Sequence, residues 1–178
     1  MIIEGYLQAM YARDFPLSMR ATICLEQSYI EVDGDSASSA EIYALLSSVS
    51  EVPLRQDIAV TGSVNQMGDI QPVGSVSEKI EGFFEVCKKT GLTGAQGVMI
   101  PRLNIPNLIL SSETQEAVRS GSFHIYAVST VDEGLEILTG VSSGARGIRG
   151  GFPPGSMNGR VQRRLKEMAF LVKDFGGN

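Results

Sequence analysis

The chain has 178 residues, of which 43% are hydrophobic, and a formal net charge of -5. A chain of this length buries one sizeable core but is short for two ordinary domains, so we expect a single globular domain. The acidic balance argues against a nucleic-acid partner, because binding to phosphates requires clustered Lys and Arg. No apolar run approaches the roughly 20 residues that span a bilayer, and no signal-peptide pattern is present, so we expect no membrane partner.

Two cysteines and one histidine restrict the chemistry that the side chains can provide. Cys24 and Cys87 lie far apart in apolar stretches. This placement favours reduced core thiols in a cytoplasmic protein over a disulfide or a metal site. His124 is the only histidine, which excludes a histidine-rich metal cluster, and we assign it no role.

The first part of the chain predicts a helix followed by two strands. Apolar residues with helical spacing predict the helix within residues 5–14. The apolar segments 21–25 and 29–32 predict strands.

An acidic turn at residues 33–35 precedes a second predicted helix. Apolar residues recur there at i, i+3, i+4 and i+7, which predicts an amphipathic helix over residues 36–49 with Asp35 as its N-cap. The recurring residues are Ile42, Leu45, Leu46 and Val49. We therefore expect Ser36 at a helix N-terminus.

The segment after Pro53 predicts a strand, a hairpin and a third helix. Residues 57–61 are typical of a buried strand, and residues 67–69 are typical of the turn of a hairpin whose return arm is 70–73. In the third helix, Ser75 and Glu78 have capping-box spacing, and Gly91 can end the helix. Its apolar stripe is Ile80, Phe83, Phe84 and Cys87. We expect Lys79 in the first turn, at the border of this stripe.

The rest of the chain alternates between strands and helices, which predicts an α/β fold with some α+β character. We expect strands at 97–100 and 123–128, helices at 112–119 and 131–138, an irregular segment rich in Gly and Pro at 141–159, and a final helix at 161–173.

Ser36 is a candidate nucleophile. A catalytic serine needs a base within hydrogen-bond reach and donors for the developing oxyanion. A helix N-terminus offers such donors, because its first N–H groups lack partners within the helix. The same Gly-Asp-Ser sequence is also a common helix cap without any catalytic role.

Lys79 is a candidate base. A lysine can replace histidine in this role when burial removes its proton, since desolvation lowers the pKa of an amine. At the border of the apolar stripe, the amine of Lys79 can point into the domain. Most lysines in such positions are solvated, so a structural reading stays open.

Thr61 and two acidic residues can support these groups. Thr61 ends the predicted strand, where its hydroxyl can orient the lysine amine; the alternative is a turn residue before Gly62. Asp33 and Asp35 flank Ser36 and either tune the site electrostatically or act as caps and solvated charges.

Three segments, in order along the chain, carry a family resemblance. They are V-D-G-D-S-A-S at residues 32–38, P-L-R-Q-D-I-A-V-T-G-S-V at 53–64 and V-G-S-V-S-E-K-I at 73–80. Together they resemble the proteolytic domain of Lon proteases, particularly the archaeal-type branch and its bacterial relatives. Ser36 and Lys79 are 43 positions apart (79 minus 36), as in the dyad of this family. The resemblance extends over nearly the whole chain.

The resemblance implies a serine endopeptidase in which Ser36 is the nucleophile, Lys79 the general base and Thr61 the residue that positions the lysine. Asp35 matches the acid that precedes the serine in this branch. The implied fold is a mixed sheet packed by helices. In it, residues 1–140 form the core, and residues 141–178 add a Gly/Pro-rich segment and a C-terminal helix to the same domain.

The resemblance also implies partners and a cofactor. It predicts ATP-dependent cleavage of unfolded or damaged polypeptides by a homo-oligomer, a hexameric ring, in the cytoplasm. The sequence contains no G-x-x-x-x-G-K-[ST] loop, so we expect no cofactor in this chain and ATP in a separate ATPase module of a longer protein.

Two other functions stay open. One is a catalytically silent module for binding or oligomerisation. The other is nucleic-acid binding through a basic cluster, which the overall acidity opposes. That cluster consists of Arg146, Arg149, Arg160, Arg163, Arg164 and Lys166.

Overall fold

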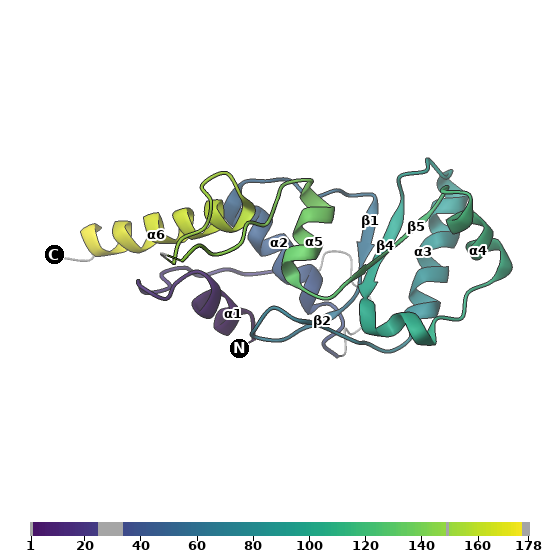
Figure 1. The fold of residues 1–178 in the computed structure, drawn as a ribbon, viewed down its shortest axis with the longest axis horizontal. Coiled ribbons are helices and arrows are strands. Elements are labelled where there is room, and N and C mark those ends of the chain that lie inside the picture. Colours follow the sequence, from purple (N-terminus) through teal and green to yellow (C-terminus); the bar gives the residue numbers. More distant parts are fainter. Residues whose placement is uncertain (1, 25–33, 149, 176–178) are drawn as a thin grey trace.

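The structure is a computed structural model that describes residues 2–24, 34–148 and 150–175 (Figure 1). At its centre, three strands form a parallel sheet in the order β1-β4-β5. They are β1 (Ile58–Val60), β4 (Gly97–Pro101) and β5 (His124–Val128). Gly97 of the central strand pairs with Ile58 on one side and with His124 on the other. A helix lies in each connection between these strands, as parallel crossovers generally require.

Helices cover both faces of this sheet. One face carries α2 (Ser38–Ser50) and α5 (Val131–Thr139), and the other carries α3 (Val76–Thr90) and α4 (Ser112–Arg119) (Figure 1). Strand β4 is buried along its whole length and contributes to both sides. Met99 packs in the hydrophobic cluster with α2 and α5, whereas Val98 and Ile100 pack in the cluster with α3 and α4. The predicted α/β class is confirmed.

The first and last helices of the described chain both pack beside α2. Helix α1 (Ile2–Met10) and helix α6 (Met157–Phe175) contribute buried residues to the same cluster as α2. The hydroxyl of Tyr11 donates to Oδ1 of Asn158, in the first turn of α6, at 2.6 Å. The second half of α6 extends away from the body, with Phe170 and Leu171 exposed (Figure 1).

A separate hairpin follows β1. Strands β2 (Ser63–Val64) and β3 (Ile70–Gln71) pair antiparallel. Gly68 in the predicted turn has a φ of 88°, a conformation that glycine adopts readily. The return arm is shorter than predicted. The expected mixed sheet is therefore a parallel sheet with an antiparallel hairpin beside it.

The N-terminal predictions agree least with the structure. The predicted strand at 21–25 is wrong for its described residues, because 21–24 are in no helix or strand. The predicted strand at 29–32, like Asp33, lies outside the described residues. Cys24 is exposed and not a core thiol, whereas Cys87 is buried as expected.

The elements from α3 onward agree more closely with prediction. Helix α4 has the predicted bounds, and α3, β4, β5 and α5 follow the expected alternation, whereas the 3₁₀ helix η1 (Arg102–Asn107) was not predicted. Helix α6 begins at Met157, earlier than the predicted residue 161, because the hydroxyl of Ser156 accepts from the N–H of Gly159 at 3.1 Å and caps the helix. None of the described helices is both long and apolar enough to span a bilayer.

Candidate active site

Thr61 lies at the end of β1 and contacts residues from both sides of the sheet. It directly follows β1, at the carboxyl end of a parallel strand, where α/β proteins commonly bind ligands. Its N–H donates to the carbonyl of Met99 at 3.0 Å, which keeps it in line with the central strand. The residue is buried, so its hydroxyl has a fixed environment.

Lys79 reaches Thr61 from the α3 face. Its Nζ donates to Oγ1 of Thr61 at 3.2 Å. Val76 and Ile80 on the same helix are buried against the sheet, which fixes the side of α3 that carries the half-buried Lys79. The amine therefore points toward the end of β1, as the apolar stripe predicts.

Ser36 reaches Thr61 from the α2 face. Its carbonyl accepts from Oγ1 of Thr61 at 3.3 Å and from the N–H of Gly62 at 2.9 Å. The hydroxyl of Thr61 thus connects the lysine amine to the backbone of the serine. The structure brings these three candidate residues together.

Asp35 is not the N-cap of α2, and the helix does not begin at Ser36. The helix begins at Ser38 after Ala37, whose side chain makes no capping hydrogen bond. The carbonyl of Asp35 accepts from the N–H of Ser38 at 3.3 Å and from its hydroxyl at 3.1 Å, while the Asp35 carboxylate accepts from the hydroxyl of Ser63. The prediction failed because this carboxylate finds a partner distant in sequence before it can cap the helix.

Segment 61–64 binds loop 34–37 and the first turn of α2 through further contacts. The N–H of Ser39 donates to the carbonyl of Gly62 at 3.1 Å, and the N–H of Val64 donates to the hydroxyl of Ser38 at 3.0 Å. A Cβ on Gly62 would lie 3.1 Å from Oγ of Ser39, so this close approach favours glycine. Sequence reasoning missed Ser38 and Ser63. The two-residue period of an extended segment, which places residues 61 and 63 on one side, could have indicated Ser63.

The start of α3 is held in a strained and clamped conformation. Ser75 precedes the helix with a φ of 56° and makes no side-chain cap, contrary to the predicted capping box. Just before it, Asn104 of η1 donates from Nδ2 to the carbonyl of Val73 at 2.9 Å, and its Oδ1 accepts from the N–H of Val73 at 3.1 Å. These two hydrogen bonds and the backbone conformation of Ser75 together fix the residue at which α3, the helix that carries Lys79, begins.

Glu81 connects α3 to α4 on the outer side. Its carboxylate accepts from the N–H of Ser111 at 2.7 Å and from the hydroxyl of Thr114 at 2.7 Å. Burial raises the pKa of Glu81, but these hydrogen bonds outweigh it and hold the pKa below its ordinary value. The carboxylate is thus engaged in structure.

Other chemically active side chains lie elsewhere. Cys87 is buried in the cluster with α3, and burial raises the pKa of its thiol, which disfavours the nucleophilic thiolate. His124 begins β5, at the end of the sheet opposite to Thr61, and its Nε2 lies 2.8 Å from the carbonyl of Gly94. Among the described residues, no three His, Cys, Asp or Glu side chains are grouped to hold a metal ion.

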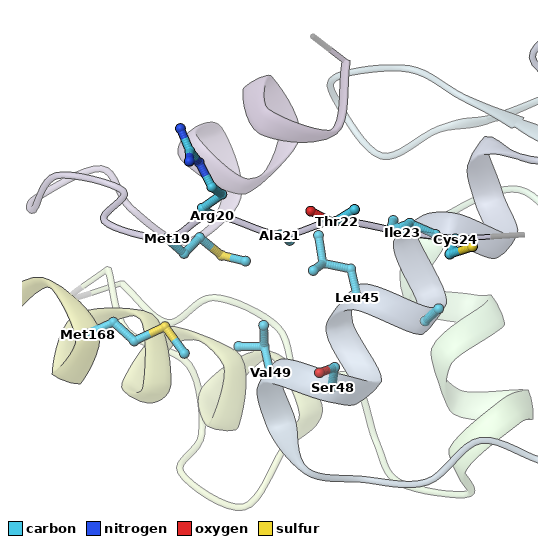
Figure 2. A pocket seen from close by; sticks show the side chains of 11 residues that line it. Met19, Arg20, Ala21, Thr22, Ile23, Cys24, Leu45, Ser48, Val49 and Met168 are labelled. Carbon is cyan, nitrogen blue, oxygen red and sulfur yellow. The ribbon is translucent and has the colours of Figure 1, made fainter.

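Two hollows on the described surface do not include the three candidate residues. One, of about 600 Å³, lies between residues 19–24, α2 and Met168 of α6, with Leu45 and Val49 in its lining (Figure 2). The other, of about 780 Å³, lies between the start of α3 and residues 104–109. Neither hollow is the place where Ser36, Thr61 and Lys79 converge.

This α/β domain therefore brings together, at the carboxyl end of β1, residue types that acyl transfer through a serine can use. They are a serine in a loop before a helix, a lysine amine, and a threonine hydroxyl that connects this amine to the backbone carbonyl of the serine. Peptide-bond hydrolysis is one reaction within this class.

Comparison with known proteins identifies the family. The Lon protease (S16) C-terminal proteolytic domain family matches residues 11–140. A protein described as a Lon protease homolog from Escherichia coli (strain K12) is 49% identical over 138 residues, which are 78% of this chain and 24% of that protein. A homolog from Haemophilus influenzae is 44% identical over 140 residues, 79% of this chain and 23% of that protein. The archaeal Lon protease of Thermococcus kodakarensis is 37% identical over 111 residues, 62% of this chain and 16% of that protein.

The chain belongs to the family of Lon protease proteolytic domains, as its sequence motifs predict. It spans about a quarter of the length of its bacterial relatives. The division into a core at 1–140 and an added part at 141–178 stays a prediction.

Proposed function

We propose that this chain is the proteolytic part of a Lon-type serine endopeptidase, with Ser36 as nucleophile and Lys79 as general base. The observation that carries the proposal is the pair of hydrogen bonds that connects Nζ of Lys79, Oγ1 of Thr61 and the carbonyl of Ser36. Family membership supports protease activity, and this geometry supports the assignment of the residues.

The direction of the two hydrogen bonds suits a basic amine. The single hydroxyl proton of Thr61 goes to the carbonyl of Ser36, so its oxygen accepts an N–H from Lys79. A neutral amine has two N–H donors and one lone pair. Donation to Thr61 uses one N–H and leaves the lone pair for the proton of the Ser36 hydroxyl. Thr61 is then a positioning residue for both partners.

The proposed reaction has two steps. Oγ of Ser36 attacks the peptide carbonyl while Lys79 takes the hydroxyl proton, and Lys79 then gives this proton to the leaving amine as the acyl-enzyme forms. Water next loses a proton to Lys79 and attacks the acyl carbonyl, which releases the acid and restores the Ser36 hydroxyl. Backbone N–H groups beside Ser36 stabilise the oxyanion of each tetrahedral intermediate. Asp35 supports the loop that carries the serine.

The activity that we propose for the whole protein rests on the names of its longer relatives. We propose ATP-dependent cleavage of unfolded or damaged polypeptides in the cytoplasm by a homo-hexameric ring, with ATP bound by a module outside these 178 residues. Nucleic acid and membrane lipid are not proposed as partners. In the structure, Arg163 and Arg164 of the basic cluster lie within ion-pair distance of Glu167.

Hydrolysis of a casein substrate by the purified chain tests this function. We expect slow cleavage by the wild type, and a loss of at least about 1000-fold in Ser36→Ala and in Lys79→Arg, because a guanidinium stays protonated and cannot act as a base. Lys89→Arg, at an exposed position near the end of the same helix, is the matched control and should cleave like the wild type. Turnover retained in Ser36→Ala would overturn the proposal. A silent binding module would show no cleavage in any variant.

A further inference from the structure

Ser63 makes a contact that the proposed reaction does not use. Its hydroxyl donates to the carboxylate of Asp35, the residue directly before the candidate nucleophile. The two residues are 28 positions apart in the chain, and both belong to the surface at the edge of the sheet. A hydroxyl bound to a carboxylate forms one of the stronger hydrogen bonds in proteins, because the acceptor is charged.

Three consecutive residues of segment 61–64 hold two consecutive residues of the nucleophile loop. Thr61 and Gly62 donate to the carbonyl of Ser36 through a hydroxyl and a backbone N–H. Ser63 donates to the side chain of Asp35. Donors from the end of β1 and the start of β2 thus hold the side chain of Asp35 and the carbonyl of Ser36.

The other hydrogen bonds of the loop in the described residues go to α2: the carbonyl of Asp35 accepts from the N–H and the hydroxyl of Ser38, and the carbonyl of Ala37 accepts from the N–H of Glu41. Residues 34–37 lie outside α2, and the side chain of Ala37 makes no capping hydrogen bond. Ser36 and Ala37 are only half-buried, and Gly34 and Asp35 are exposed. A loop with few buried apolar contacts is positioned by its individual polar contacts, and each contact has a large share in its order.

We infer that Ser63 is a positioning residue: by holding the Asp35 carboxylate on β2, it fixes the loop in the orientation that presents Ser36 to Lys79. This inference rests on the proposed function. Thr61 acts on both members of the dyad, whereas Ser63 acts only on the nucleophile side and does not touch a reacting atom. Misplacement of a catalytic group by about 1 Å can cost on the order of 100-fold in rate.

Four single variants of the full chain and one double variant separate positioning from general loosening of the hairpin. Ser63→Ala removes the hydroxyl, and Ser63→Thr keeps it on a residue that strands accommodate well. Asn65→Ala is the control, because Asn65 lies in the same hairpin and its side chain bonds within the turn, to Met67 and Asp69. Asp35→Ala removes the acceptor. Two readouts are used: the rate of fluorophosphonate labelling at Ser36, and hydrogen exchange of the amides of residues 35–39.

We expect labelling of Ser63→Ala to slow by about 10- to 100-fold and amides 35–39 to exchange faster. Ser63→Thr should restore both, Asn65→Ala should change neither, and Asp35→Ala combined with Ser63→Ala should be no slower than the worse single variant. Three results would overturn the inference and leave the proposed function standing. They are labelling of Ser63→Ala at the wild-type rate, unchanged hydrogen exchange of amides 35–39, and a Ser63→Thr variant that does not restore labelling. If no variant is labelled, the wild type included, the proposed function fails, and the inference fails with it.

Discussion

The two sides of the sheet hold their parts of the candidate site by different means. On the α3 side, Lys79 lies in a helix that is anchored by the buried residues Val76, Ile80, Phe84 and Cys87. On the α2 side, Ser36 lies before the helix begins and is held by hydrogen bonds to segment 61–64. Packing places the base, and polar contacts place the nucleophile. Substitutions in the core should therefore change stability, and substitutions in segment 61–64 should change reactivity.

The largest effect on stability should come from the two cores. Phe123 packs its ring 5.2 Å from that of Phe84 between the sheet and α3, and Leu135 of α5 is buried on the opposite face. We expect Phe123→Ala to cost about 3–5 kcal/mol and Leu135→Ala about 2–5 kcal/mol, because each leaves a cavity. Urea unfolding followed by circular dichroism measures both. Since the two clusters share strand β4, one transition is expected in each variant, and two separate transitions would show that the faces unfold independently.

Thr61→Val should separate reactivity from stability. The valine keeps the shape of the side chain but removes the bonds to Nζ of Lys79 and to the carbonyl of Ser36. Labelling of Ser36 should fall about 100-fold, whereas the free energy of unfolding should fall by only about 1 kcal/mol. Thr61→Ser retains the hydroxyl and serves as the control. Equal labelling of the valine and serine variants would contradict the connecting role of the hydroxyl.

A smaller effect is expected at the start of α3. Ser75 has a φ of 56°, which glycine adopts without steric cost, so Ser75→Gly should stabilise the chain by about 0.5–1 kcal/mol. Ser75→Ala keeps the strain and loses no cap, so it should give no gain. The midpoint of urea unfolding compares the two variants. A glycine variant that is less stable than the alanine variant would show that this conformation is not strained.

The smallest effect concerns Asp132, on the α2 side. Burial raises its pKa above 3.8, although Nδ2 of Asn158 donates to Oδ1 at 3.1 Å and opposes the shift. A carboxyl whose pKa is raised in the folded state binds more protons when folded. Its contribution to stability therefore decreases as the pH rises from the unfolded pKa through the raised folded pKa. Asp132→Asn should therefore be more stable than the wild type at neutral pH. This margin should disappear below pH 3.8, where the acid is protonated in both states. Thermal unfolding between pH 3 and pH 7 measures it, and a margin independent of pH would refute this origin.

The sequence predicts the elements from Val76 to Gly140, on both faces of the sheet, better than the segment before α2. From Val76 to Gly140, helices and strands alternate with local signals at their ends, such as the hydroxyl of Thr130 that accepts from the N–H of Glu133. Local patterns determine such elements. Loop 34–37 depends on partners distant in the chain, and the described part of the predicted strand, 21–24, and the cap at Asp35 are wrong.

The same distinction applies to the site. Ser36, Thr61 and Lys79 could be named from motifs and their order, and the structure brings them together, although their roles stay predictions. Ser63 was not named with them: the two-residue period of its segment indicates only that it lies on the same side as Thr61, and its partner Asp35 is 28 positions away. Contacts between segments distant in sequence become visible only in the folded chain.

Intact-mass analysis after treatment with a fluorophosphonate tests the central claim most directly. The claim predicts one adduct on the wild-type chain, mapped to Ser36 by peptide analysis, which is absent in Ser36→Ala and in Lys79→Arg but retained in Lys89→Arg. An adduct that persists in Lys79→Arg, or that maps to a different serine, would contradict a lysine-activated nucleophile at the edge of this sheet.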